Sequence, residues 1–285
     1  MEARGIKYFF YTHLILTVII IDFLTNTHLC SQIAVDLYNA ISNIDYVSII
    51  LPILAEEKVR DKLGRFTSLK ESKNVNPLPK HILDPLVGSM LGDGSIRFNH
   101  KDKMGKPSGN ANYAMTLKNH EYIMHLWSNI YSYLCTATFP KPWPNPQTGL
   151  PASQYTFSTR CLVQLTLLHK IWYRWSEELN KFIKIVPLNI GELLTPIGLA
   201  LWIQDDGHKD GNGLVLCTEC FTLSEVELLI SVLRDNFGLT STIRERKQKG
   251  KHIGWRIYIR AENKDKLISL VKPYFVPSML YKLDL

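Results

Sequence analysis

Apolar residues along this chain follow a helical spacing in some stretches and alternate with polar residues in others. Two apolar runs of helix length, residues 86–93 and 199–206, each end in an acid that is followed by glycine. The spacing predicts two apolar helices. If these helices pack side by side, their terminal acids, Asp93 and Asp206, come together.

Short polar signals mark where the two helices begin and end. Asp84-Pro85 and Thr195-Pro196 each combine a capping residue with a proline that suits the first helical position. Gly94 and Gly207 follow the acids, and glycine readily adopts the left-handed backbone that ends many helices. We therefore expect the helices to begin at the prolines and to stop at the glycines.

After each apolar helix the pattern changes to a period of two and then returns to helical spacing. The elements predicted in the first half are strands at residues 95–99, 112–117 and 154–160 and helices at 121–134 and 162–175. Those predicted in the second half are a strand at 213–217, a helix at 224–236, a hairpin at 240–260 and a helix at 263–274. The order αββαββα thus occurs twice, with 113 residues between the matching acids. A duplication of that length indicates two pseudo-symmetric halves.

The start of the chain lacks this pattern. Residues 8–24 are its most apolar run, but 17 residues that include His13 and Asp22 are short for a membrane span. This segment is compatible with two interpretations, a membrane-associated tail and a plain N-terminal extension. A polar linker with two prolines, residues 71–79, follows. The predicted organisation is an extension at 1–79, a first repeat at 80–190 and a second repeat at 191–285.

Composition narrows the class of protein. The chain has 285 residues and a formal charge of +7, which favours an anionic partner such as nucleic acid. Its five cysteines have no recurring spacing, which argues against a disulfide framework, and Cys217–Cys220 is a single CxxC that suits a strand end better than a zinc site. The chain has no HEXXH or HNH-like histidine spacing, no P-loop and no dinucleotide-binding GxGxxG pattern.

Asp93 and Asp206 are the candidate metal ligands. An acid at a helix C-terminus faces the negative end of the helix dipole, which costs about 0.3–1 kcal/mol. The same placement twice, on helices expected to meet, favours a shared divalent cation, and carboxylate ligands suit Mg²⁺ or Mn²⁺. The alternative is a helix that happens to end in Asp-Gly. Asp205 is expected to point elsewhere on its helix, outside the site.

The predicted hairpin at 240–260 carries a basic face. Arginine and tyrosine side chains alternate with isoleucines along its strands, and a two-stranded ribbon of this kind fits the DNA major groove. The alternative is an ordinary solvated sheet face. The candidate DNA contacts are Arg244, Arg246, Lys249, Arg256, Tyr258 and Arg260 in the second half, and Arg97, Lys103 and Arg160 in the first.

The two motifs, Leu86-Val-Gly-Ser-Met-Leu-Gly-Asp93-Gly94 and Leu199-Ala-Leu-Trp-Ile-Gln-Asp205-Asp206-Gly207, resemble the two copies of the LAGLIDADG motif in single-chain LAGLIDADG homing endonucleases. The segments Lys184-Ile-Val-Pro187 and Val276-Pro-Ser-Met-Leu-Tyr-Lys282 also resemble this family, so that the likeness covers roughly residues 80–285. It implies an α+β fold of two αββαββα repeats whose curved antiparallel sheets form a DNA-binding saddle. It also implies that Lys184 and Lys282 are basic residues near the cleavage centre. The second motif departs from the family pattern, because Leu201 and Trp202 replace small residues at the helix contact.

The resemblance implies a function. A monomer would cut both strands of a long DNA target with Mg²⁺ or another divalent ion, in the service of intron mobility. The alternative is a maturase that binds its host intron RNA and assists splicing, with or without DNA cleavage; a non-catalytic DNA-binding regulator would not need both acids. The resemblance and the Ile-, Asn- and Lys-rich composition suggest an organelle-encoded protein, mitochondrial or, as the other option, from the chloroplast.

Overall fold

The computed structural model describes residues 75–103 and 107–285, all of which belong to one compact unit, Lys58–Leu285. The apolar segment at 8–24 and residues 71–74 of the predicted linker lie outside the described residues. Within the described part of the chain, no helix has both the length and the apolar character that crossing a membrane requires.

Two antiparallel sheets, each of four strands, share one strand order. The first contains β1 (Ser95–Lys101), β2 (Pro107–Leu117), β4 (Gln154–Ser158) and β3 (Lys141–Trp143), hydrogen-bonded in that sequence. The second contains β7 (Gly207–Asp210), β8 (Gly213–Cys217), β10 (Lys251–Ile259) and β9 (Ser241–Gln248), in the corresponding sequence. The matching topology confirms the predicted α+β fold with two αββαββα repeats.

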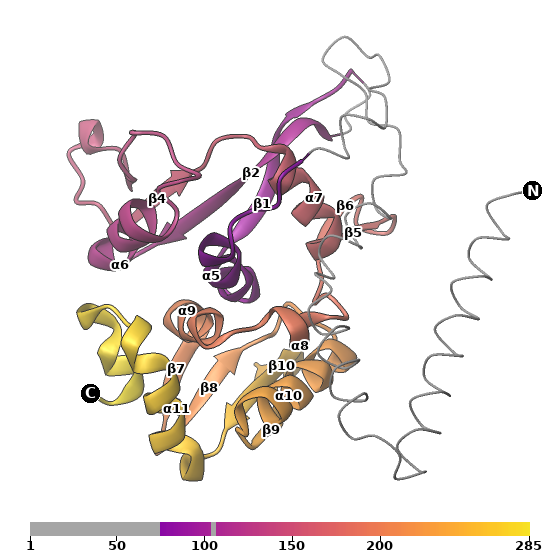
Figure 1. Ribbon diagram of the computed structural model, residues 1–285, viewed down its shortest axis with the longest axis vertical. Coiled ribbons are helices and arrows are strands. Elements are labelled where there is room, and N and C mark those ends of the chain that lie inside the picture. Colours follow the sequence, from indigo (N-terminus) through magenta and orange to yellow (C-terminus); the bar gives the residue numbers. More distant parts are fainter. Residues whose placement is uncertain (1–74, 104–106) are drawn as a thin grey trace, which may run out of the picture. The chain divides into compact units, whose positions relative to one another are not determined.

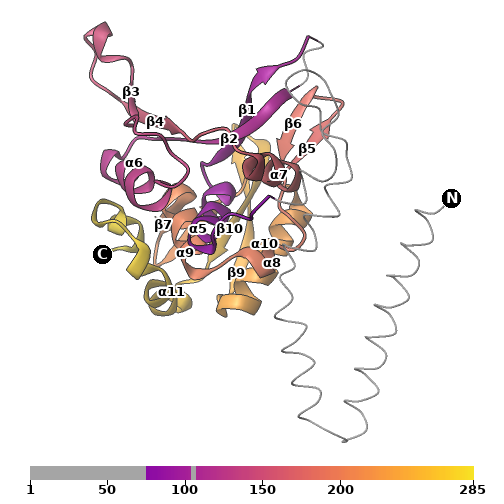
Figure 2. The same cartoon turned by 45° about the horizontal axis from the view of Figure 1, so that its top comes forward.

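The helices of each repeat take corresponding places. In the first they are α5 (Lys80–Leu91), α6 (His120–His125), which continues as the π-helix η1 (Leu126–Ile130), and α7 (Val163–Trp172). In the second they are α9 (Pro196–Asp206), α10 (Leu223–Phe237) and α11 (Lys264–Val271). Figures 1 and 2 both show α5 beside α9, between the two sheets. One hydrophobic core includes residues of both helices, so the repeats fold as one body.

The contact between α5 and α9 depends on two glycines. A Cβ atom added to Gly88 would lie 1.9 Å from the carbonyl oxygen of Gly198, and one added to Gly198 would lie 3.0 Å from the carbonyl oxygen of Asp84. The backbones therefore touch at Gly88 and Gly198. The bulky Leu201 and Trp202 are buried on α9 without blocking this approach, because Gly198, just before the second motif, supplies the small residue.

The predicted helix limits hold for α9 and fail for α5. Thr195 caps α9, its side chain accepting a hydrogen bond from the Gly198 amide, and Pro196 is the first helical residue. By contrast α5 begins at Lys80, so that Pro85 lies inside it, because Leu78 and Ile82 bury apolar surface that prolongs the helix toward the N-terminus.

The predicted left-handed glycine stops are wrong for both helices. Gly207 has a φ of −81°, and Gly94 is also outside the left-handed region. Both glycines are needed for space. A Cβ at Gly94 would lie 2.6 Å from the carbonyl oxygen of Ser89, and a Cβ at Gly207 would lie 2.6 Å from the carbonyl oxygen of Ile203. The chain turns sharply against the end of its own helix there, and only glycine leaves room.

In the second half, β7 was not predicted, and the helix predicted at 263–274 ends at Val271. The first half differs in three further places. The helix predicted at 162–175 ends at Trp172, and the following residues form a hairpin of β5 (Tyr173–Ser176) and β6 (Lys181–Lys184). Aromatic residues in β5 favour a strand once β6 is available to pair with it. The helix predicted at 121–134 ends at Ile130, and the strand β3 occurs within the Pro-rich loop.

The β9–β10 hairpin has the predicted two-faced character. Its turn is Lys249-Gly250, with φ values of 50° and 77°, as a type I′ turn requires. Arg244 lies opposite Arg256 in the register, while Ile257 and Ile259 are buried on the core side. The arginines therefore share the face of the sheet that points away from the core.

Candidate active site

The two acids lie at the paired ends of α5 and α9. Asp206 is the last residue of α9, whereas Asp93 is exposed in the turn that follows α5. Burial, and then the negative charge of Asp93, raise the pKa of Asp206 to about 7. Partial desolvation by the surrounding helix ends also raises the pKa of Asp93, although the residue as a whole is exposed. The charge of Asp93 thus acts on the carboxyl group of Asp206 at the paired helix ends.

Lys184 and Lys282 hold the two helix ends. The Lys184 Nζ donates to the carbonyl oxygens of Gly92 and Gly94, at 3.0 and 2.7 Å. The Lys282 Nζ donates to three carbonyl oxygens at the end of α9, those of Ile203, Gln204 and Asp205 at 3.3, 2.5 and 3.0 Å. Carbonyls at a helix C-terminus have no partner within the helix, and a cation there also opposes the helix dipole.

The same ammonium groups stabilise the charged forms of the acids. Lys184 and Lys282 lower the pKa values of Asp93 and Asp206, against the larger effect of burial. Lys184 is on β6, near the end of the first repeat, and Lys282 is in the 3₁₀ segment η5 (Pro277–Leu283), near the end of the second. In each repeat, a lysine near the C-terminal end therefore donates hydrogen bonds at the end of the motif helix of the same repeat.

The side chain of Asp205, expected to lie outside the site, packs against α6 and the end of α5. Its Oδ2 atom is buried, and its Oδ1 atom accepts a 2.7 Å hydrogen bond from the hydroxyl group of Tyr122 on α6. A Cβ added to Gly92 would lie 2.5 Å from the Cβ of Asp205, so the two residues are in direct contact. Burial, and then the charge of Asp93, raise the pKa of Asp205 well above its ordinary value.

Tyr122→Phe is expected to lower the free energy of unfolding by about 1–3 kcal/mol, because it removes the hydrogen bond to a buried carboxyl group. The matched control is Tyr281→Phe. Tyr281 is 64% exposed, so loss of its hydroxyl group should lower the free energy of unfolding by less than about 0.5 kcal/mol. Urea unfolding at pH 7 measures both. Equal midpoints for the two variants would contradict this role of Tyr122.

A divalent cation fits the chemistry of the paired acids. Two partly desolvated carboxyl groups, of which Asp93 raises the pKa of Asp206, provide the hard oxygen ligands that Mg²⁺ and Mn²⁺ prefer. Within the described ranges, no group of three or more His, Cys, Asp or Glu side chains is arranged to hold a metal ion. Any further ligands would therefore come from other groups, such as a bound phosphate or water.

The two cysteines of the CxxC motif lie at the end of β8 and in the loop that follows it. Cys217 and Cys220 are free thiols, and the Cys217 Sγ atom contacts the Nδ1 atom of His208 at 3.8 Å. The described residues place no further ligand set around them.

The predicted DNA contacts of the second repeat lie together on the outer face of its sheet, and several are engaged by other side chains. Arg244 forms an ion pair with Asp210 and stacks over the ring of Tyr258, with 3.5 Å from its Cζ atom to the ring centroid. Arg246 and Arg256 both bind Glu219. Two further candidates, Lys249 and Arg260, are exposed at the ends of this hairpin.

The candidates of the first repeat are more scattered. Arg97 donates to the Ser158 hydroxyl group at 3.3 Å, across the first sheet, and Lys103 is exposed beyond β1. Arg160 donates to the carbonyl oxygen of Tyr133 at 2.5 Å, which ties it to the segment after η1. The first sheet is thus the sparser basic surface, as the sequence indicated.

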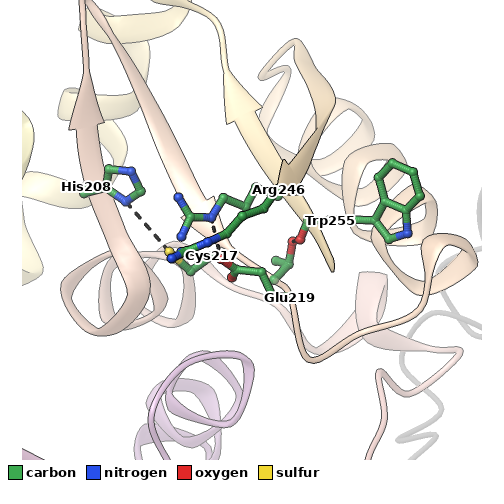
Figure 3. Close-up of polar contacts among 7 residues, drawn as sticks. His208, Cys217, Glu219, Arg246 and Trp255 are labelled. Atoms are coloured by element: carbon green, nitrogen blue, oxygen red, sulfur yellow. Dashed lines mark hydrogen bonds and ion pairs between the residues drawn. The ribbon is translucent and has the colours of Figure 1, made fainter. Parts of the chain in front are cut away.

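Sequence reasoning missed three residues that shape this region: Tyr122, Gly198 and Glu219. Figure 3 shows Glu219 and Arg246 pointing toward each other on the second sheet. A glutamate after the apolar strand β8 has no local signature, because its partner arginines are reached only through the sheet. Gly198 could have been identified from the sequence, because it is a small residue in the first turn of α9, three residues after the capping residue Thr195.

Comparison with known proteins gives the same two-repeat architecture. The family model described as the LAGLIDADG DNA endonuclease family matches residues 84–267. The cytochrome b mRNA maturase bI2 of Debaryomyces hansenii is 34% identical over 220 residues, which cover 75% of this chain and 79% of that protein. The intron-encoded endonuclease ai4 of Dictyostelium discoideum is 37% identical over 132 residues, 46% of this chain and 78% of that protein.

A solved structure is also similar. The homing endonuclease I-WcaI, bound to its DNA recognition sequence, matches with a TM-score of 0.58 at 25% identity, over 76% of this chain and 92% of that one. The relatives thus include both intron-encoded endonucleases and a maturase. Since the family model spans well over half of the residues, and each of the two motifs carries its acid followed by glycine, this chain belongs to the LAGLIDADG DNA endonuclease family.

Proposed function

We propose that this protein is a site-specific DNA endonuclease that cuts both strands of a long duplex target and depends on a divalent cation, with Mg²⁺ as the leading candidate. The observation that carries the proposal is the pair of acids at adjacent helix ends, each beside a lysine. One acid and one lysine come from each repeat, so one monomer would provide a complete site for two strands.

The acids and the lysines of the site would have different roles. Asp93 and Asp206 would hold the metal, which when bound activates a water molecule and stabilises the charge on the leaving oxygen. Lys184 and Lys282 keep the acids ionisable and fix the carbonyls behind them. With DNA bound, their positive charge would also oppose the charge that develops on the phosphate.

DNA would lie along the outer faces of the two sheets, with residues 80–190 facing one half of the target and 191–285 the other. The side chains of Arg244, Arg246, Arg256 and Tyr258 would face the groove of the second half-site, and Lys249 and Arg260 the phosphates. Arg97, Lys103 and Arg160 would serve the first half-site. Arginines suit guanine edges, whereas lysines act as point charges on phosphates.

The second candidate function is that of a maturase. It is favoured by the likeness to cytochrome b mRNA maturase bI2, which covers three quarters of this chain. In that case the protein would bind the RNA of its host intron and assist splicing, in a mitochondrion. Because both acids are present, the two activities would coexist rather than exclude each other.

Removal of the divalent cation is expected to abolish cleavage and to leave DNA binding largely intact. The test substrate is a duplex that joins the two sequences flanking the gene's own intron. Wild-type protein should produce one discrete double-strand cut with Mg²⁺ and none with excess EDTA, because the paired acids alone cannot activate water.

A duplex of the same composition in shuffled order is the matched control, and binding of the intron RNA is measured in parallel. Absence of any cut with Mg²⁺ or Mn²⁺ would overturn the endonuclease proposal. Tight and specific RNA binding without a cut would instead establish the maturase.

A further inference from the structure

Glu219 lies in the loop between β8 and α10, on the sheet face that carries the arginines. The Arg256 Nε atom donates to the Oε1 atom of Glu219 at 2.5 Å, and the Arg246 Nη1 atom donates to the same oxygen at 2.8 Å. The side chains of Glu219 and Arg256 are each only 20% exposed. One sheltered carboxylate therefore holds two arginines that start from neighbouring strands (Figure 3).

The loop that carries Glu219 is itself anchored to β10. The buried Thr218 donates a 2.7 Å hydrogen bond from its hydroxyl group to the carbonyl oxygen of Trp255. A Cβ added to Gly254 would lie 2.7 Å from both the Cα and the carbonyl oxygen of Glu219, so the backbones are in contact. The position of Glu219 is thus set by main-chain contacts on both sides, rather than by its ion pairs alone.

This cluster lies close to the acids. Arg256 lies opposite Cys217 in the pairing of β8 with β10, and the Cys217 Sγ atom contacts the Nδ1 atom of His208 at 3.8 Å. His208 follows Asp206 by two residues. A base contacted by Arg256 would therefore be near the cleaved bonds.

We infer that Glu219 is a specificity-determining residue that orients Arg256 to read a guanine edge near the cleavage centre. The inference rests on the DNA cleavage proposed above. Arginine has five N–H donors, and Glu219 engages the one on Nε of Arg256. The Cys217 side chain also hydrogen-bonds with the Arg256 side chain and further fixes the guanidinium plane, as bidentate recognition of guanine O6 and N7 requires.

The carboxylate also limits contacts to the wrong groups. An arginine without a fixed partner can turn to any nearby phosphate, which raises affinity equally for all sequences. Glu219 opposes this in two ways, because it holds Arg246 and Arg256 in place and because its negative charge repels phosphate. Its removal should therefore increase general affinity and reduce discrimination at the base that Arg256 reads.

The test compares Glu219→Gln with Glu245→Gln. Both remove one negative charge from the same sheet, but Glu245 pairs with Lys247 and His252 instead of an arginine. Each protein is used in selection from a randomised duplex library in Ca²⁺ and in salt titrations with a shuffled duplex. For Glu219→Gln we expect about a tenfold loss of preference at one or two base pairs near the centre, as the loss of one bidentate contact predicts. The slope of log K against log [salt] should also become steeper by about 1.

Two further variants separate orientation from charge. Arg256→Lys should lose preference at the same base pairs, and combining it with Glu219→Gln should add no further loss there. Gly254→Ala, which displaces the Glu219 loop without changing its charge, should reproduce the loss of preference but not the full change in salt slope.

A selection profile for Glu219→Gln that equals that of Glu245→Gln, while wild-type protein selects a defined site, would overturn this inference and leave the endonuclease proposal standing. A wild-type protein that selects no site would overturn both. Thermal unfolding of each variant verifies that the proteins compared are folded.

Discussion

Asp206→Asn is expected to abolish DNA cleavage and, in the absence of metal, to gain stability relative to wild type as the pH rises. Asparagine keeps the shape of the side chain but cannot supply the negative charge that a divalent cation needs. Loss of one preorganised charged group at a reacting phosphate lowers the rate by at least about 10²–10³-fold.

The effect on stability follows from the direction of the pKa shift. Asp206 titrates near 7 in the folded protein and near its ordinary value of about 4 in the unfolded chain. Between these values the folded protein binds more protons, so the free energy of unfolding falls as pH rises through this window. An asparagine side chain does not titrate and has no such dependence. The stability of the variant relative to wild type should therefore increase by about 2 kcal/mol from pH 5 to pH 8.

Urea unfolding at pH 5 and pH 8 in EDTA measures this difference, and cleavage in Mg²⁺ measures activity. Asp265→Asn, at an exposed acid in the first turn of α11, is the matched control and should change neither. An Asp206→Asn protein that still cuts, or whose stability relative to wild type is the same at both pH values, would contradict the assignment.

Gly88→Ala is expected to lower the free energy of unfolding by at least about 4 kcal/mol or to prevent folding, well beyond the usual cost of overpacking. The new methyl group would lie 1.9 Å from the carbonyl oxygen of Gly198, and its other near neighbours are backbone atoms of the same residue. Backbone atoms cannot move aside as a flexible side chain does, so α5 and α9 would have to separate.

Gly191→Ala, within the short helix α8 (Ile190–Leu193), is the matched control. Its Cβ would meet only the Cγ2 atom of Val232, at 3.3 Å, and alanine favours the helix more than glycine does. Circular dichroism with urea measures both proteins. A Gly88→Ala variant within about 1 kcal/mol of wild type would show that the helices do not meet at this residue.

Local patterns were sufficient to predict much of this fold. The β9–β10 hairpin was predicted because arginine and isoleucine alternate there, and α9 because Thr195-Pro196 forms a cap whose hydrogen bonds are within a few residues. The limits of α5 were missed, because the core contacts of Leu78 and Ile82 outweigh the proline signal at Pro85. The β5–β6 hairpin was missed because Tyr173 and Trp175 suit a helix or a strand, and pairing with β6 decides.

The residues of the candidate site were likewise predictable only where the signal is local or repeated. Asp93 and Asp206 were accessible from sequence because a repeated motif places them at equivalent helix ends. The hydrogen bond between Tyr122 and Asp205 joins residues that are 83 positions apart, and no pattern in either segment indicates it. Glu219 likewise reaches Arg256 only through the sheet pairing of β8 with β10.

The contact of Gly92 with Asp205 makes the two halves unlike where they meet. These residues hold equivalent positions, each just before its motif acid, and the carboxylate of one fills the space that the other lacks a side chain to fill. Two copies of the first half would leave a void there, and two copies of the second would force two buried carboxyl groups together. The two repeats are thus complementary at this contact instead of identical. Each half of the chain therefore pairs with the other half, and a symmetric pairing of two identical halves is disfavoured.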